Sequence, residues 1–132
     1  MMVTLVMGAP GAGKSTWARE RLGDRGLAYD LDAIAGAFRL RGPHEEYCPA
    51  ARAMADDLLP GWLRAVAEYA DDVYVIRTAP TWQELEGIQP DRAVVCMTRY
   101  TRHGVGDAMT VARRRADAET WLKARGIPIE YA

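Results

Sequence analysis

The sequence has little lysine, little cysteine and no long apolar run. Only two of its 17 basic residues are lysine, Lys14 and Lys123, whereas arginine and alanine are abundant. This bias is typical of a GC-rich genome, so a single arginine is weak evidence of function. The two cysteines, Cys48 and Cys96, argue against a disulfide framework and fit a reducing compartment. No apolar stretch approaches the roughly 20 residues that cross a bilayer. We therefore expect no membrane segment and a cytoplasmic location.

The charge and the length are those of an ordinary globular domain. The chain has 132 residues, of which 49% are hydrophobic, and its net charge is −1. Because the charge is nearly balanced, it gives no general attraction to nucleic acid or to anionic membranes. We find no repeat, no low-complexity segment and no linker. A single domain over residues 1–132 is the expectation.

A glycine-rich segment follows the first apolar run. Residues 3–7 have the length of a short strand, and residues 17–22 predict a helix that Gly23 ends. The residues between them match the phosphate-loop pattern G-x-x-x-x-G-K-[ST]. Glycine permits positive φ and close approach of the backbone, so several N–H groups can point at one anion beside a helix N-terminus. The predicted nucleotide-binding residues are Gly8, Pro10, Gly11, Ala12, Gly13, Lys14, Ser15 and Thr16.

Two of these side chains have a specific chemistry in such a loop. Lys14 can reach the β- and γ-phosphates, and the Ser15 hydroxyl can be a ligand of Mg²⁺. The segment therefore predicts a site for a nucleoside triphosphate with magnesium. No residue of this sequence determines the base of the nucleotide. We take the nucleotide to be ATP, because proteins of this fold commonly bind ATP.

The rest of the chain alternates between expected strands and helices. The expected strands are residues 27–30, 73–76, 93–97 and 127–129. The expected helices are residues 33–40, capped by Asp32, then 50–70, 82–86 and 108–125. Within 50–70, Pro60 must either kink one helix or begin a second. We expect the tryptophans at positions 62, 82 and 121 to belong to the core. This alternation predicts a parallel α/β sheet with right-handed crossovers, and ligands then bind beyond the carboxyl ends of the strands.

Two aspartates stand at the end of the second expected strand. Transfer of a phosphoryl group needs a base that takes the proton of the acceptor hydroxyl, and Asp32 is the best candidate for it. Asp30 is the other carboxylate and a candidate to help hold the metal. The alternative is that Asp32 only caps a helix, while Asp30 is exposed or assists the metal.

Basic residues gather in the last third of the chain. Between Arg92 and Arg125 there are eight basic residues against three acids. Arginines 113–115 point in three directions about 100° apart on a helix, so they cannot all serve one site. One of them, or Arg99 or Arg102, could close over the γ-phosphate. The alternative is a solvated helix face in an arginine-rich chain.

Residues 8–20, G-A-P-G-A-G-K-S-T-W-A-R-E, resemble the opening of the phage-type polynucleotide 5′-hydroxyl kinases, a branch of the small P-loop kinases. The segment Tyr29-Asp30-Leu31-Asp32 is similar to their acidic pair, which implies that Asp32 activates the acceptor hydroxyl. The resemblance also implies an arginine-bearing lid after the fourth strand, similar in place to Arg99, Arg102 and Arg113, of which Arg99 and Arg113 are our candidates to act on the nucleotide. Its fold would be a P-loop NTPase three-layer sandwich, with a five-stranded parallel sheet of order 2-3-1-4-5 and helices on both faces.

Two positions differ from that family. Where the family has an acid after the third strand, this chain has Arg77-Thr78-Ala79, so Asp30 or Asp32 would have to assist the metal. Where the family has an arginine one turn after the base, this chain has Ala35, and Arg39 follows one turn later.

The sequence therefore predicts an ATP-dependent phosphotransferase with a hydroxyl acceptor. A polynucleotide 5′-hydroxyl is the favoured acceptor, and a nucleoside, a sugar or another small alcohol is the alternative within the same class. A nucleotide-binding ATPase or switch module without an acceptor is the alternative from another class.

Overall fold

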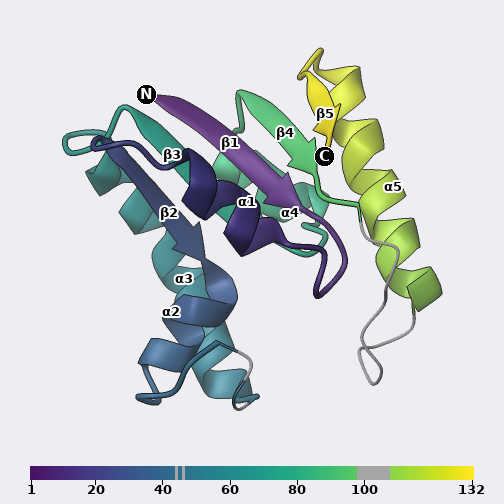
Figure 1. Cartoon of the computed structure of the whole chain (residues 1–132). Coiled ribbons are helices and arrows are strands. Elements are labelled where there is room, and N and C mark those ends of the chain that lie inside the picture. The colour runs from purple at the N-terminus through teal and green to yellow at the C-terminus, as the bar shows by residue number, and fades with distance from the viewer. Residues whose placement is uncertain (44, 46, 98–107) are drawn as a thin grey trace.

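The computed structural model describes residues 1–43, 45, 47–97 and 108–132. Five strands form one sheet in the order β2-β3-β1-β4-β5, and every neighbouring pair is parallel (Figure 1). The strands are β1 (Met2–Met7), β2 (Gly26–Asp30), β3 (Asp72–Arg77), β4 (Arg92–Val95) and β5 (Ile129–Tyr131). This order confirms the predicted topology.

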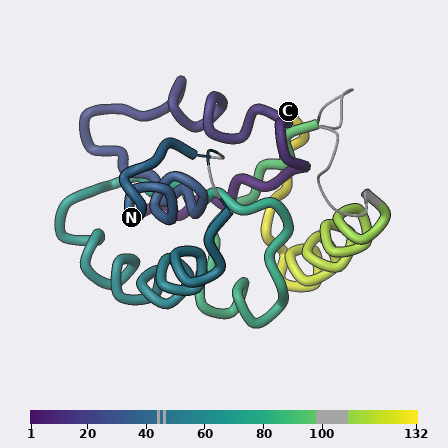
Figure 2. Tube along the Cα trace, turned by 90° about the horizontal axis from the view of Figure 1, so that it is seen from below, coloured from purple at the N-terminus to yellow at the C-terminus, as the bar shows by residue number. Residues whose placement is uncertain are grey.

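Helices lie on both faces of the sheet, as predicted. They are α1 (Lys14–Arg21), α2 (Leu31–Ala37), α3 (Pro49–Val66), α4 (Trp82–Ile88) and α5 (Ala108–Ala124). Seen from below, α1 lies on one side of the strands and α3, α4 and α5 on the other (Figure 2). In the described part of the chain, no helix has the length and apolar character needed to span a bilayer.

The central strand β1 is buried on both faces because helices cover both, and its buried residues are apolar except Thr4. Leu5 and Met7 belong to the larger core cluster with residues of α3, α4 and α5, whereas Val6 packs with Ala18 of α1. This explains why the strand lacks the alternation of a half-exposed one. Because β1, β2 and β3 are parallel, their carboxyl ends lie at the same edge of the sheet. The phosphate loop begins at this edge.

Two local expectations need correction, and one alternative is decided. The cap of α2 is Asp30 and not Asp32, because β2 continues in extended conformation to Asp30 and the helix begins at Leu31. Of the two alternatives at Pro60, the structure has the single helix, because Pro60 lies inside α3. The last strand begins at Ile129, because Ile127 N–H still closes the end of α5 on Leu122 O and Pro128 has no N–H.

The tryptophans divide between core and surface. Trp121 is almost fully buried, and Trp62 is partly buried against the core, where its ring contacts that of Tyr29. Trp82 is 54% exposed, so its assignment to the core was wrong. It lies at the start of α4, and its indole N–H donates to the carbonyl of Asp117 on α5.

Candidate active site

The phosphate loop joins β1 to α1, and its first glycine, Gly8, packs closely against the residues that follow β3 and β4. Gly8 N–H donates to Thr78 O at 3.1 Å, and a Cβ at Gly8 would lie 2.5 Å from Cys96 O. Only glycine fits there. Gly11 and Gly13 have φ of 81° and 87°, a region that side chains rarely adopt. The glycines therefore serve two needs, close packing at Gly8 and positive φ at the other two.

Lys14 begins α1 and folds back over the loop. Its Nζ donates to Gly8 O at 2.9 Å and to Ala9 O at 3.1 Å. Burial lowers the pKa of the Lys14 ammonium, and the negative charges of Asp32 and Asp30 oppose that shift. The cation is thus fixed beside the loop by carbonyls and set near two carboxylates.

Ser15 and Asp30 come together from different elements. Ser15 Oγ donates to Asp30 Oδ2 at 2.5 Å, while Asp30 Oδ1 accepts from the N–H of Asp32 at 3.1 Å. Asp30 is therefore immobilised by both of its oxygens. A hydroxyl and a carboxylate next to a loop of the phosphate-binding pattern suit Mg²⁺, which takes few protein ligands and completes its shell with phosphates and water. Accordingly, the described residues contain no cluster of three or more acidic, histidine or cysteine side chains that could hold a metal alone.

Asp32 lies in the first turn of α2, two residues after its cap, Asp30. Its Oδ1 accepts from Arg52 NH1 at 2.5 Å, and the two side chains are 29% and 38% exposed. Arg52 comes from the first turn of α3, and small residues of the two helices, among them Ala35 and Ala55, pack together below it. The candidate base is thus paired with an arginine from another helix.

One cavity of about 400 Å³ joins these groups. Gly8 and Ala12 do not line it, because Gly8 faces Cys96 and Ala12 packs against the core on the α1 side. Of the predicted residues, those that line the cavity are Pro10, Gly11, Gly13, Lys14, Ser15, Thr16, Asp30 and Asp32. The phosphate loop and both early aspartates therefore open on the same space.

The arginines of α5 are placed differently from our expectation. Arg113 and Arg114 are both exposed, but Arg114 lines the cavity and Arg113 lies outside its lining. Arg115 turns to Glu119, whose carboxylate lies 3.3 Å from Arg115 Nε. Arg99, like Arg102, lies outside the described residues. Within α5, Arg114 is the arginine of this triplet that reaches the site.

The end of β3 carries a charge network in place of the family's acid. Arg77 is only 12% exposed, and its guanidinium forms ion pairs with Asp56 of α3 and Glu84 of α4. Thr81 caps α4 by accepting from Glu84 N–H, which fixes Glu84 in the first turn. Arg77 and Glu84 both line the cavity. An acid is present at this end of the site, but it comes from α4 and already neutralises a cation.

Sequence reasoning did not single out Arg52, Glu84 or Arg114 as lining this site. For Arg114 the sequence gave a partial indication. Arginines 113–115 point in different directions on a helix, so only part of the triplet can face a site. Arg52 and Glu84 had none, since each reaches the cavity through the packing of a helix remote in sequence from the loop.

Among the comparisons with known proteins, only the comparison with solved structures gives matches, and these support the fold. No protein-family model and no curated protein sequence matches the chain. A chain in a structure of the Pnkp1/Rnl/Hen1 RNA repair complex aligns over 93% of this chain, at 13% identity and a TM-score of 0.60. The alignment covers 45% of that chain, so this chain spans less than half of its length.

Two smaller kinases align over nearly their whole length. Shikimate kinase from Bacteroides thetaiotaomicron matches 97% of this chain and 85% of its own, at 17% identity and a TM-score of 0.55. A sugar kinase from Janibacter sp. HTCC2649 matches 100% of this chain and 84% of its own, at 14% identity and a TM-score of 0.52. The chain has the fold of the P-loop kinases. At these identities the similarity establishes the architecture and leaves the acceptor open.

Proposed function

We propose that the chain is a P-loop phosphotransferase that moves the γ-phosphoryl group of ATP to a hydroxyl acceptor. The observation that carries this proposal is the shared cavity, into which the phosphate loop and the carboxylate of Asp32 both open. The loop supplies the donor site, and Asp32 supplies a base on the acceptor side. A favoured acceptor is a polynucleotide 5′-hydroxyl, because residues 8–20 and the acidic pair resemble polynucleotide kinases.

The loop binds the polyphosphate through its own backbone. Positive φ at Gly11 and Gly13 turns N–H groups toward one point, and the N-terminus of α1 adds its unpaired N–H groups. Lys14 exchanges its two carbonyl partners for phosphate oxygens. Ser15 and Asp30 would hold Mg²⁺, which neutralises phosphate charge when bound.

In the transfer step the phosphoryl group passes directly from ATP to the acceptor, and the protein forms no covalent bond to it. The acceptor oxygen forms a bond to the γ-phosphorus, the bond from that phosphorus to the bridging oxygen breaks, and ADP leaves with the bond's electrons. Asp32 accepts the proton of the attacking hydroxyl. Arg114, which lines the same cavity, is positioned to stabilise negative charge on the moving group.

The decisive experiment measures where the phosphate goes. The protein is incubated with γ-labelled ATP, Mg²⁺ and a panel of 5′-hydroxyl oligonucleotides, nucleosides, sugars and shikimate. Label on an acceptor supports the proposal, and its identity selects the acceptor class. Label released only as free phosphate with every acceptor contradicts it.

A second candidate function is a slow ATPase or switch module without an acceptor. It is favoured by Arg77, a cation at the strand end where related kinases have a metal-assisting acid. Release of free phosphate at a rate that no acceptor alters is the outcome that would support this candidate.

A further inference from the structure

A second cavity, of about 350 Å³, lies where the start of α4 faces α5. Its lining consists of Pro80, Thr81, Trp82, Arg114 and Asp117. Two of these residues, Thr81 and Arg114, also line the cavity of the candidate active site. The two cavities are therefore neighbours, and a ligand that extends past Arg114 out of the first cavity reaches the second.

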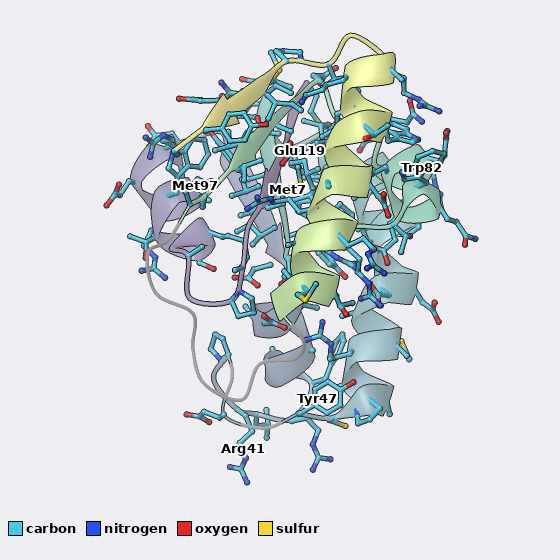
Figure 3. All side chains as sticks on the ribbon, turned by 90° about the vertical axis from the view of Figure 1, so that its right-hand side faces the viewer. Met7, Arg41, Tyr47, Trp82, Met97 and Glu119 are labelled. Carbon is cyan, nitrogen blue, oxygen red and sulfur yellow. The ribbon has the colours of Figure 1, made fainter. Side chains whose placement is uncertain are left out.

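Trp82 is the most exposed tryptophan of the chain, with 54% of its surface accessible. Its ring is nevertheless held in place, because the indole N–H donates to Asp117 O at 2.9 Å. A second contact ties α4 to α5, since Glu86 accepts from the indole N–H of Trp121 at 3.2 Å. Figure 3 shows Trp82 on the α4 side of α5, with Glu119 on the opposite side of that helix. The second cavity therefore has an aromatic wall in a fixed position.

The lining of the second cavity combines groups that suit a flat ring with polar edges. The indole of Trp82 offers a π face, and Pro80 adds an apolar wall. Arg114 ends in a planar guanidinium, which stacks on rings, and it has no ion-pair partner among the residues that the structure describes. Asp117 adds a carboxylate, which accepts hydrogen bonds from N–H groups and repels anions. A neutral aromatic ring that carries N–H donors meets all of these groups favourably.

We propose that the second cavity binds a base of a nucleic-acid acceptor, namely the base of the nucleotide next to the one that carries the reacting 5′-hydroxyl. The reacting nucleotide lies in the first cavity, and the chain continues past Arg114 to Trp82. Stacking on an indole is open to any base, because every base has a π face, while the carboxylate of Asp117 favours bases with an amino group. The inference rests on the proposed function and narrows its acceptor to chains of at least two nucleotides.

The test compares two dinucleotide acceptors that differ only in their second base. One is thymidine followed by deoxyadenosine, and in the other an abasic tetrahydrofuran residue replaces the deoxyadenosine. Both have the same reacting nucleotide and the same phosphodiester, so their charges are equal. Trp82→Ala removes the ring, and Trp82→Phe keeps a ring without the indole N–H. Tyr69→Ala, at an aromatic residue that is 67% exposed and lies just after α3, is the matched control.

In the wild type and in the Tyr69→Ala control, KM should be about 5- to 150-fold lower for the dinucleotide with the second base, the range expected for stacking of one base. In Trp82→Ala the two KM values should become nearly equal, and in Trp82→Phe their ratio should lie between. Because the ratio is taken within one protein, a general loss of folded molecules does not alter it. Equal KM values in the wild type, or a ratio that Trp82→Ala leaves unchanged, overturns the inference.

A binding measurement separates this inference from the proposed function. Calorimetric titration of both dinucleotides into protein that holds a non-hydrolysable ATP analogue needs no turnover. A preference for the second base that is lost in Trp82→Ala supports the base site even if no transfer is seen. Transfer to both dinucleotides without such a preference leaves the kinase function standing and refutes the base site. Binding of maltose that depends on Trp82, with no preference between the dinucleotides, would assign the cavity to a sugar ring and also overturn the inference.

Discussion

The two ends of the cavity are built in different ways. The phosphate end comes from one continuous segment, residues 8–16, and presents mainly backbone N–H groups and one lysine. The acceptor end is assembled from α2, α3, β3 and α4, and it presents the side chains of Asp32, Arg52, Arg77 and Glu84. A backbone site needs glycines at fixed positions and tolerates little change. A side-chain site can change its ligand by substitution without altering the fold.

Charge reinforces this difference. At the phosphate end, Lys14 has only carbonyl partners for its three donors, which leaves it suited to exchange them for an anion. At the acceptor end each cation faces a carboxylate, as in Arg52 with Asp32 and Arg77 with Glu84. The first end is prepared for a highly charged ligand, and the second for a ligand that must compete with internal ion pairs.

The largest expected effect separates the two ends by function. Asp32→Asn should lower phosphoryl transfer by about 10² to 10⁴ because the base is lost. It should leave nucleotide affinity nearly unchanged, because the loop and Ser15 are intact. Single-turnover transfer and fluorescent-nucleotide binding measure the two quantities.

Asp57→Asn on the exposed surface of α3 is the matched control for that variant, and it should alter neither quantity. If Asp32→Asn instead reduces folding stability and nucleotide affinity together, the residue is structural and the division of labour between the two ends fails.

The contrast also explains how much the sequence could predict. The phosphate loop was predictable because its chemistry depends on consecutive residues, and Gly8, Gly11 and Gly13 are needed wherever the chain makes this turn. The strand–helix alternation predicted a parallel sheet, and the strand order was implied by the resemblance of the phosphate-loop segment to the small P-loop kinases. Buried strands such as β1 are apolar except for a residue such as Thr4, and they lack polar alternation, so their positions were clear within one or two residues.

The acceptor end was harder because tertiary packing decides it. Arg52 stands 20 positions after Asp32 and reaches it only because α2 and α3 pack through alanines. The cap of α2 was misassigned because two aspartates, at positions 30 and 32, both suit a helix start. The backbone decides between them, since Asp30 is extended and its Oδ1 accepts from the N–H groups of Asp32 and Ala33 in the first turn of α2.

The second prediction concerns Arg114, the arginine of α5 that lines the cavity. Arg114→Ala should reduce transfer about 10- to 100-fold, because Arg114 lines the cavity and offers charge-assisted hydrogen bonds to the nucleotide. Arg113→Ala, one position away and exposed, should have little effect. Transfer rates of the two variants, measured side by side, decide the assignment. A larger loss in Arg113→Ala would return the role to the residue that the sequence favoured.

The third prediction damages the phosphate end alone. Gly8→Ala should destabilise the fold by about 1–3 kcal/mol, because its Cβ would lie 2.5 Å from the backbone oxygen of Cys96. Nucleotide affinity should fall with it, since the loop must shift. Urea denaturation and nucleotide titration measure the two effects.

Gly61→Ala is the matched control for Gly8→Ala. Gly61 lies inside α3 with no atom nearer than 3.7 Å to an added Cβ, so alanine should be neutral or slightly stabilising there. A Gly8→Ala protein as stable as Gly61→Ala would mean that the loop is not held by close packing on Cys96.

The smallest expected effect tests the charge held at the phosphate end. Burial lowers the pKa of the Lys14 ammonium in the folded protein below its ordinary value of 10.5. Between the lowered pKa and the ordinary pKa of lysine, the folded protein therefore binds fewer protons than the unfolded chain. The free energy of unfolding of the wild type should therefore rise with pH in this window relative to Lys14→Met. The slope of the difference cannot exceed about 1.4 kcal/mol per pH unit for one group. Urea denaturation of both proteins from pH 7 to 10 measures it. A difference that stays constant, or that favours Lys14→Met increasingly as pH rises, would mean that the folded state does not disfavour the ammonium, and that the loop carbonyls and the two aspartates fully offset its burial.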